Sequence, residues 1–448
     1  MHDFEFYNPT KIIFGKGKEN LIGKVLKDYD IKKVLFVYGQ SSIKNTGLYD
    51  RVISSLKEND IQWVEHGGVK PNPVLSHTRE GIEKAKKENV DVVLAVGGGS
   101  VLDEGKAIAV GAKSDVDVWE YFHRDKEITD ALPVFTILTL AATGSEMNGY
   151  AVITNEETQE KLSIGSELIY PKVSILNPEL TFTVSKEYQA YAAVDAIAHT
   201  IEWYFTCIVC PNLENRLVES IVKTVMETTE KILQNPTDYD ARAEFMWAAT
   251  LALNGITRTG YAGGVYVNHM IAHSLGALYD LPHGACLSIV IPAWMWWYKD
   301  KSRKQFDRFA KEVFNLPTAE EGIKALKNFQ DRKDFIDLIT GFKRVSQILK
   351  GIEIEKLPSL DPTLFKEKEE NELYSKMLEL QPKLEDFLNK KEYIKYLETL
   401  LEFKELIDRF FDNVFVMVED KKIRENRLKL LAEISIHFNS FGDFTYLM

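Results

Sequence analysis

The sequence has few cysteines, and their small number narrows the class of protein. Only Cys207, Cys210 and Cys286 occur among 448 residues. An odd, sparse set in so large a chain argues against a disulfide framework, so we expect a reducing, cytoplasmic location. Cys207 and Cys210 lack the second pair that a zinc ribbon needs, and we interpret them as incidental.

Segments that direct a protein to a membrane are also missing. The N-terminus has no basic stretch followed by an apolar one, and no run of 18 uncharged apolar residues occurs anywhere. Basic residues are in deficit as well, because 55 lysines and arginines face 67 acidic residues and the net charge is −12. We therefore expect neither a standard secretion signal nor a membrane span, and non-specific nucleic-acid binding is a poor hypothesis.

The composition that is present indicates several folded units. Apolar residues make up 45% of the chain and charged residues 27%, as in globular proteins. In residues 1–184, short apolar segments alternate with amphipathic ones, which predicts an α/β domain with a parallel sheet. Residues 185–329 are mostly helical and begin at Ser185, a favourable N-cap. Residues 330–448 have long, charged, Leu-rich helical periodicity and predict a third, helical part.

A glycine-rich turn ends one of the predicted strands, at residues 97–100. Glycines let backbone N–H groups approach a pyrophosphate, and the following helix directs its positive end toward it. The run matches neither G-x-G-x-x-G nor G-x-x-x-x-G-K-[ST], so an ordinary strand-to-helix turn explains it about equally well. Thr139 and Thr143 favour a phosphate site, because they follow another apolar strand and offer small hydroxyls.

The first strand ends in a turn that bears on cofactor choice. An acidic residue at this place in such sheets accepts a hydrogen bond from a free ribose 2′-hydroxyl. Here the turn contains Gly39, Gln40, Ser41, Ser42 and Lys44 instead. This room, the hydroxyls and one positive charge suit a 2′-phosphate and predict NADP(H) rather than NAD(H). The alternative is a polar turn that touches no ligand.

Four of the nine histidines cluster in sequence with an aspartate. Asp195 and His199 are four residues apart, so on the predicted helix they share one face, and His269 and His273 do the same. His283 follows in a loop. Five candidates for four places would hold Fe(II) or Zn(II) and leave one histidine for proton chemistry. The alternative is that each is an ordinary buried histidine. No partner is identifiable for the other five: His2, His66, His77, His123 and His437.

These motifs together resemble one enzyme family. GGGSVLDEGK at 97–106, LTLAATGSE at 138–146 and the D-x3-H and H-x3-H-x9-H spacings are similar to those of iron-containing alcohol dehydrogenases, in particular the NADPH-dependent butanol dehydrogenase branch. The resemblance spans about residues 4–329. It implies a Rossmann-like N-terminal domain, an all-helical metal domain, a cleft between them and a homodimer.

The resemblance also implies roles for individual residues. Asp195, His199, His269 and His283 match the metal ligands, and His273 matches the histidine beside the nicotinamide. The turn from Gly39 to Lys44 matches the part that meets the 2′ position. The remaining cofactor-binding positions implied are Gly97, Gly98, Gly99, Ser100, Asp103, Thr139, Thr143 and Lys161.

The implied activity is interconversion of small primary alcohols and aldehydes, such as butanol and butanal, by hydride transfer. The metal would polarise the substrate oxygen, and His273 could relay the hydroxyl proton. Trp294, Trp296 and Trp297 either line the cleft or fill the core, and the second role is more common.

The familiar pattern ends near residue 329, where a second resemblance begins. Residues 410–434, with 343–349 before them, resemble the C-terminal helical domain of the bacterial glycyl-tRNA synthetase beta subunit, so the chain reads as a fusion. This implies an alternative function, tRNA binding by 330–448, beside an impaired dehydrogenase. Its basic residues would form a stripe, or else pair with neighbouring acids on solvated helix faces. They are Lys343, Arg344, Lys421, Lys422, Arg424, Arg427 and Lys429.

Overall fold

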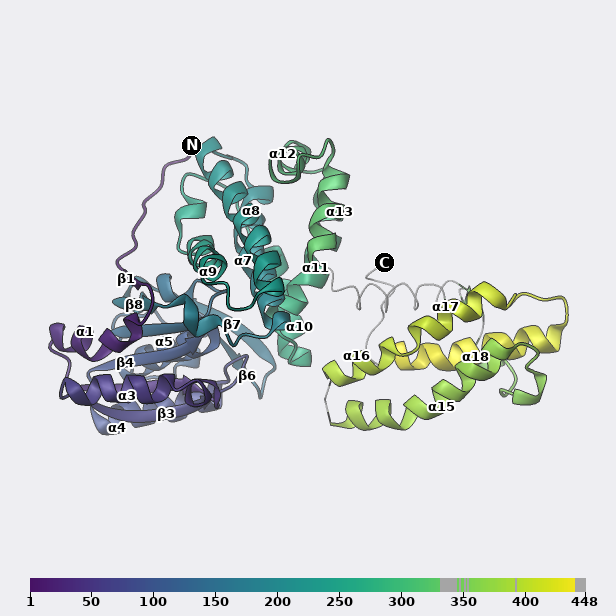
Figure 1. The fold of residues 1–448 in the computed structure, drawn as a ribbon, viewed down its shortest axis with the longest axis horizontal. Helices are drawn as coiled ribbons and strands as arrows, with labels where there is room; N and C mark the ends of the chain where they lie inside the picture. Colours follow the sequence, from purple (N-terminus) through teal and green to yellow (C-terminus); the bar gives the residue numbers. More distant parts are fainter. Residues whose placement is uncertain (331–344, 346–347, 350–351, 353, 391–392, 440–448) are drawn as a thin grey trace. The chain divides into compact units, whose positions relative to one another are not determined.

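The computed structural model describes residues 1–330, 345, 348–349, 352, 354–390 and 393–439 (Figure 1). The chain divides into two compact units, Met1–Phe329 and Gln330–Met448. Lys343 and Arg344 of the predicted basic stripe lie outside the described residues. Among the described residues, no helix combines the length and the apolar character needed to span a bilayer.

The first unit begins with a parallel sheet, as the alternating pattern predicts. Six strands lie in the order β1-β8-β5-β4-β2-β3, and every neighbouring pair is parallel. β2, β4 and β5 have continuous, largely apolar buried cores, as expected for strands that helices cover on both faces. A separate antiparallel pair, β6 and β7, follows the fifth strand. The strands are β1 (Lys11–Phe14), β2 (Lys33–Gly39), β3 (Gln62–Val69), β4 (Val92–Gly98), β5 (Val134–Leu140), β6 (Tyr150–Asn155), β7 (Glu160–Gly165) and β8 (Val173–Leu176).

Helices pack on both faces of this sheet (Figure 1). α1 and α3 bury Leu26 and Val52 against Val34 and Phe36 of β2. α4 and α5 lie together on the opposite face, where Gly105 brings α5 close to β4. Because parallel strands end at one edge, the turns after β2, β4 and β5 lie beside one another. The helices are α1 (Ile22–Asp28), α2 (Ser42–Asn45), α3 (Leu48–Glu58), α4 (Leu75–Glu88), α5 (Gly99–Ala112) and α6 (Trp119–Phe122).

The remainder of the first unit is helical. α7 begins after Ser185, whose Oγ accepts from the backbone N–H of Tyr188 at 3.2 Å, as the predicted N-cap requires. α7 packs against α8 and α11, and its central turns are almost wholly buried. The helices are α7 (Lys186–Thr206), α8 (Asn212–Gln234), α9 (Tyr239–Ala252), α10 (Val267–Tyr279), α11 (His283–Tyr298), α12 (Arg303–Phe314) and α13 (Ala319–Gln330).

The second unit is a helical bundle with a hydrophobic core of its own. Leu373, Leu380, Tyr396 and Phe410 are buried in that core. Arg427 is also buried and makes a two-point ion pair with Glu370, with N–O distances of 2.9 and 3.0 Å. The described helices are α15 (Lys368–Asn389), α16 (Tyr393–Leu401), α17 (Lys404–Asn413) and α18 (Lys421–Asn439).

Candidate functional site

The glycine run forms the turn between β4 and α5, and close packing explains its composition. A Cβ at Gly99 would lie 2.5 Å from Oγ1 of Thr143, and one at Gly97 would lie 2.5 Å from the Val101 side chain. The first turn of α5 therefore touches the loop after β5. Gly98, Gly99 and Ser100 at this helix start line one groove together with Thr139 and Thr143, and the first N–H groups of a helix have no partner within the helix, so the arrangement suits an anionic phosphate.

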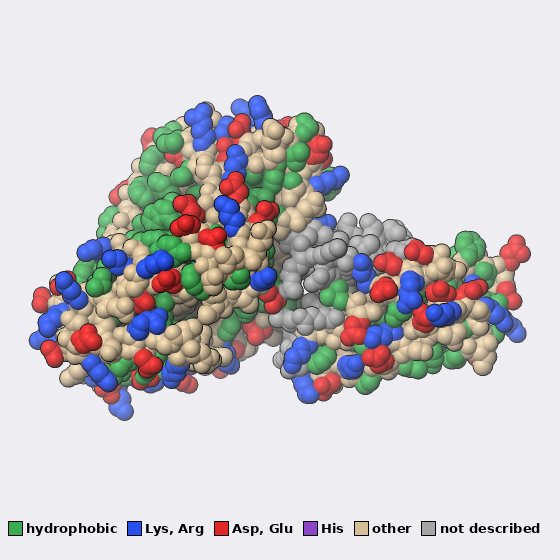
Figure 2. Space-filling view, in the orientation of Figure 1, with side chains coloured by type: hydrophobic (Ala, Val, Ile, Leu, Met, Phe, Trp, Pro, Cys, Tyr) green, Lys and Arg blue, Asp and Glu red, His purple; other side chains and the backbone are tan. Residues whose placement is uncertain are grey.

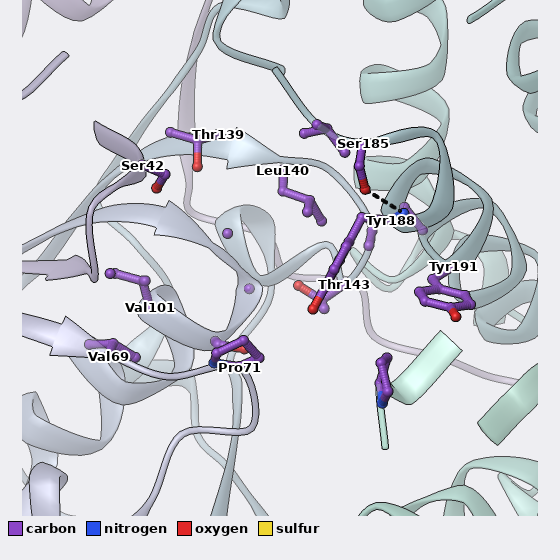
Figure 3. A pocket seen from close by; sticks show the side chains of 18 of the residues that line it. Ser42, Val69, Pro71, Val101, Thr139, Leu140, Thr143, Ser185, Tyr188 and Tyr191 are labelled. Carbon is purple, nitrogen blue, oxygen red and sulfur yellow. Dashed lines mark hydrogen bonds between the residues drawn. The ribbon is translucent and has the colours of Figure 1, made fainter. Parts of the chain in front are cut away.

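A groove of about 560 Å³ runs from the turn after β2 to the helical domain. Figure 3 shows Ser42, Val101, Thr139 and Thr143 on its α/β side and Tyr191 on its helical side. Its far end is lined by two candidate metal ligands, Asp195 of α7 and His283, the first residue of α11. Nine of the predicted cofactor residues line it: Gly39, Gln40, Ser41, Ser42, Gly98, Gly99, Ser100, Thr139 and Thr143.

The other predicted cofactor residues lie off this groove. Lys44 Nζ lies 5.1 Å from the ring centres of Tyr38 and Tyr49, so its charge is held against aromatic faces. Asp103 is half-buried and accepts from the hydroxyl of Ser145 at 2.6 Å and from the N–H of Val152 at 3.1 Å. Gly97 is within β4 and does not line the groove.

Lys161, the last of these residues, lies beside the metal candidates. Its Nζ donates to Oδ1 of Asn72 at 2.7 Å, and burial lowers its pKa. Its charge in turn helps to lower the pKa of His273 and of His283. The structure thus gives Lys161 an electrostatic role at the helical end of the groove.

The structure brings the four predicted ligands together around one carboxylate oxygen. Oδ1 of Asp195 lies 3.5 Å from Nε2 of His199 and 3.6 Å from Nε2 of both His269 and His283. Asp195 and His199 are one turn apart on α7, His269 is on α10, and His283 starts α11. The two side chains that are four residues apart on α7 and the two later histidines therefore lie together, as the sequence predicts.

The unsatisfied atoms of this cluster fit a metal ion. Oδ1 of Asp195 and Nε2 of His269 are buried and have no hydrogen-bond partner among the described residues. Buried polar atoms are normally paired, and a cation between them would satisfy both. Burial lowers the pKa of His199 to about 4 and that of His283 well below its usual value, so these two imidazoles are neutral as metal binding requires. For His269 the lowering effect of burial is outweighed by hydrogen bonds to Asp195 and Glu202, which raise its pKa to about 9. The donor set suits Fe(II) or Zn(II).

Glu202 is part of this site and was not predicted from the sequence. It accepts hydrogen bonds from Nδ1 of His269 and from the backbone N–H of Asn268, and the Asn268 amide donates to it at 3.1 Å. These contacts turn the free Nε2 of His269 toward Asp195, the usual arrangement around a ligating histidine. A signal was present, because Asp195, His199 and Glu202 form an i, i+4, i+7 series on one helix face.

His273 lies next to the cluster but outside its ligand set. Its ring centre is 5.2 Å from that of His283 and 6.5 Å from that of His269. Burial, aided by the charge of Lys161, lowers the pKa of His273 to about 3. The imidazole is therefore neutral near pH 7 and would hold a proton only transiently.

Two expectations about partners are corrected by the structure. His66 and His77, which have no recognisable partner in the sequence, both contact the buried carboxylate of Glu104. Cys207 and Cys210 are joined in a disulfide with Cα atoms 5.6 Å apart, so the interpretation of this pair as incidental was wrong. The disulfide forms because the backbone turns just after the end of α7. The contacts of Glu104 form because β3, α4 and α5 pack together.

The three tryptophans of α11 do not line the groove. Trp294 is buried and stacks on Tyr298 with ring centres 4.9 Å apart, so it has the core role. Trp296 and Trp297 are exposed, and Lys299 and Lys301 lie over their rings.

A dinucleotide-type turn, a groove and a four-donor cluster define a metal- and nicotinamide-dependent dehydrogenase class. Family models agree: residues 9–178 match the iron-containing alcohol dehydrogenase model, and 189–345 match the C-terminal model of the same family. The chain belongs to the iron-containing alcohol dehydrogenase family. Residues 338–441 match the DALR anticodon binding domain, so the fusion predicted from the sequence is confirmed.

Individual relatives support the same assignment. The probable NADH-dependent butanol dehydrogenase 2 of Bacillus subtilis is 43% identical, covering 73% of this chain and 86% of that protein. The NADPH-dependent aldehyde reductase of Escherichia coli is 37% identical over the same shares. The crystal structure of NADH-dependent butanol dehydrogenase A from Thermotoga maritima is 41% identical, with a TM-score of 0.73 over 96% of this chain and 99% of that one.

Proposed function

We propose that the chain interconverts small primary alcohols and aldehydes, with butanol and butanal as representative substrates, using NADP(H). The observation that carries this proposal is the groove, which joins the turn before α5 to Asp195 and His283. A dinucleotide laid along it would have its phosphates at the start of α5 and its reactive end at the metal candidates. Relatives named as butanol dehydrogenases and an aldehyde reductase support the substrate class.

Asp195, His199, His269 and His283 would hold the metal, either Fe(II) or Zn(II). When bound, the metal supplies a Lewis acid, and the nicotinamide supplies a hydride donor or acceptor. Glu202 fixes the orientation of His269. His273 takes the hydroxyl proton of the alcohol on a ring nitrogen and passes it outward, and it returns a proton when an aldehyde is reduced.

The preference for NADP(H) rests on the turn after β2. Among the described residues that line this end of the groove, none is acidic. The nearby carboxylate of Glu65 on β3 is already engaged, because it accepts from the hydroxyls of Tyr38 at 2.7 Å and Tyr49 at 2.6 Å. The oxygens of Glu65 are therefore occupied and are not free to accept from a ribose 2′-hydroxyl, although its negative charge remains and Lys44 is held on the aromatic rings. Several relatives are named as NADH-dependent, so the preference needs a direct test.

The test is reduction of butanal by the full chain with NADPH and with NADH, before and after addition of Fe(II) or Zn(II). We expect metal-dependent turnover with the higher kcat/KM for NADPH. His199→Ala should abolish both turnover and one equivalent of bound metal, because the donor set becomes incomplete. Turnover that persists in this variant at the wild-type rate would show that the reaction uses another site.

A second candidate function, RNA binding by the second unit, is favoured by the DALR match alone. The basic residues of the second unit offer limited support for RNA binding. Lys421 pairs with Glu425 and Lys429 with Glu433, both at 3.7 Å, while Arg427 is buried. Figure 2 shows Lys/Arg and Asp/Glu side chains intermixed on the visible face of this unit. A gel-shift titration of the full chain with bulk tRNA tests it, and saturable binding near micromolar concentration would support it.

We also propose that the chain forms a homodimer, as the family resemblance implies. We propose a cytoplasmic location on the basis of the composition. Light scattering on the full chain should give twice the 51.2 kDa chain mass. A mass equal to one chain would contradict the dimer.

A further inference from the structure

A second group of metal-ligand side chains lies in the α/β domain, on the face of the sheet covered by α4 and α5. His66 is on β3, His77 is near the start of α4, and Glu104 is on α5. Oε1 of Glu104 lies 3.1 Å from Nε2 of His66 and 2.7 Å from Nδ1 of His77. Three segments distant in sequence thus place three donor atoms within 4.8 Å of one another.

This group repeats the arrangement of the candidate catalytic metal cluster in the same chain. Here the rings of His66 and His77 are stacked, 4.2 Å apart and inclined by 26°, on a single carboxylate oxygen. In the catalytic cluster the rings of His199 and His269 are stacked, 4.6 Å apart and inclined by 20°, on Oδ1 of Asp195. The same donor types therefore converge with a similar stacking of the rings, although the N–O distances are shorter at Glu104, 2.7 and 3.1 Å, than at Asp195, 3.5 and 3.6 Å.

Glu104 has a buried atom that hydrogen bonding leaves unsatisfied. Its side chain is fully buried, yet both histidines contact Oε1 while Oε2 has no partner among the described residues. Burial raises the pKa of Glu104, but the hydrogen bonds from His66 and His77 outweigh that effect and lower it. The group is thus a buried, ionised carboxylate with one unused oxygen, and a cation would stabilise it.

The spacing of the donors suits a transition-metal ion. Imidazole and carboxylate ligands bind Zn(II) at about 2.0–2.2 Å, so neighbouring donors in a tetrahedral site are about 3.3 Å apart. The two N–O distances to Oε1 are 3.1 and 2.7 Å, and all three donor atoms lie within 4.8 Å of one another, so the three side chains would fill three of the four positions of such a shell after small shifts. We propose that His66, His77 and Glu104 bind a second divalent metal ion of the zinc class, separate from the catalytic metal.

The surroundings fit a structural metal that exchanges with solvent through one side. His66 is 1% exposed and Glu104 is 0% exposed, whereas the His77 side chain is 23% exposed and provides the entrance. Gly81, one turn after His77, keeps α4 close, because a Cβ there would lie 2.8 Å from Nε2 of His66. None of the three ligands lines the groove. The metal would tie β3 and α4 to α5, whose first turn carries Gly99 and Ser100.

Cobalt(II) titration of the metal-stripped full chain tests this proposal independently of catalysis. We expect two equivalents per chain, with visible absorption from each low-symmetry site. His77→Gln and Glu104→Gln should each bind one equivalent, and His199→Ala should retain the equivalent held in the α/β domain. His123→Gln, an exposed histidine of the same domain, is the matched control and should bind two.

Thermal unfolding gives a second measurement on the same variants. Zn(II) should raise the Tm of His199→Ala, because one site remains, and should leave the Tm of His77→Gln/His199→Ala unchanged. The proposal is overturned if His77→Gln and Glu104→Gln bind as much cobalt as the wild type, or if Zn(II) stabilises the double variant equally. Loss of turnover plays no part in either readout, so failure of the proposed dehydrogenase function is seen separately.

Discussion

Glu202 is the residue whose role in the metal site is most sharply testable. Its carboxylate accepts from His269 and Asn268 and so directs Nε2 of His269 toward Asp195. Glu202→Gln keeps the shape but removes the charge, and we expect metal affinity to fall about 10- to 100-fold. Competition with a chelator of known affinity measures this. Glu187→Gln, at the start of the same helix, is the control, and equal affinities in the two variants would contradict the assigned role.

Gly39 tests the origin of cofactor preference. A Cβ there would lie 3.7 Å from the carbonyl oxygen of Val69, so a side chain fits without displacement. Gly39→Asp would accept from a ribose 2′-hydroxyl and repel a 2′-phosphate, so the NADPH-to-NADH ratio of kcat/KM should fall about tenfold or more. Gly39→Asn has the same shape without the charge and should change the ratio much less. Equal ratios in the two variants would show that charge at this turn does not decide the preference.

Most of the candidate site residues that could be predicted were found from the spacing of residues within single helices. Asp195 and His199 share a face of α7 because they are four residues apart, and this needs no knowledge of the tertiary fold. Glu104 could not be found this way, since its partners lie 38 and 27 residues earlier, on β3 and α4. The Cys207–Cys210 disulfide was missed for a different reason, because the small cysteine count favoured a reducing environment. That the assigned side chains bind metal and cofactor stays a prediction.

At the scale of elements, the N-cap of α7 makes a testable contribution to stability. Oγ of Ser185 accepts from the N–H of Tyr188 and caps the helix that carries Asp195 and His199. Ser185→Ala should lower the free energy of unfolding by about 1 kcal/mol, whereas Ser185→Asp should preserve it. Denaturant titration followed by circular dichroism measures both. Equal losses in the two variants would mean that the hydroxyl does not act as a cap.

The elements themselves were predictable where apolar periodicity is regular. The pattern of residues 48–58 predicts a helix, and α3 spans Leu48–Glu58. Continuous apolar runs predict buried parallel strands, and β2 and β4 are nearly fully buried. The order of the strands could not be read in this way, because β1 pairs with β8 across more than 150 residues. Such pairing is decided by packing of the whole domain and not by local sequence.

At the scale of the whole molecule, the two units should unfold independently. The second unit has its own core, with the buried pair Glu370–Arg427 inside it. Glu370→Ala leaves a buried, unpaired guanidinium, which typically costs about 3–5 kcal/mol. We expect calorimetry to show one transition lowered and another unchanged, with butanal reduction unaffected. Glu379→Gln, at a surface ion pair with Lys383, is the control. A single shared transition that shifts as a whole would contradict independent units.

In the first unit, the candidate metal ligands and the candidate cofactor residues come from different elements, and this affects how metal and cofactor specificity can change. All four candidate metal ligands come from α7, α10 and α11, whereas the residues nearest the cofactor phosphates come from the edge of the sheet. Neither set supplies a donor to the other. On the proposed assignments, the residues that would bind the metal and those that would bind the cofactor phosphates therefore lie on separate stretches of chain, with Lys161 as the link between them because its charge acts on His283. A chimaera that joined residues 1–184 of this protein to the helical domain of a relative would take its nicotinamide preference from one parent and its metal from the other.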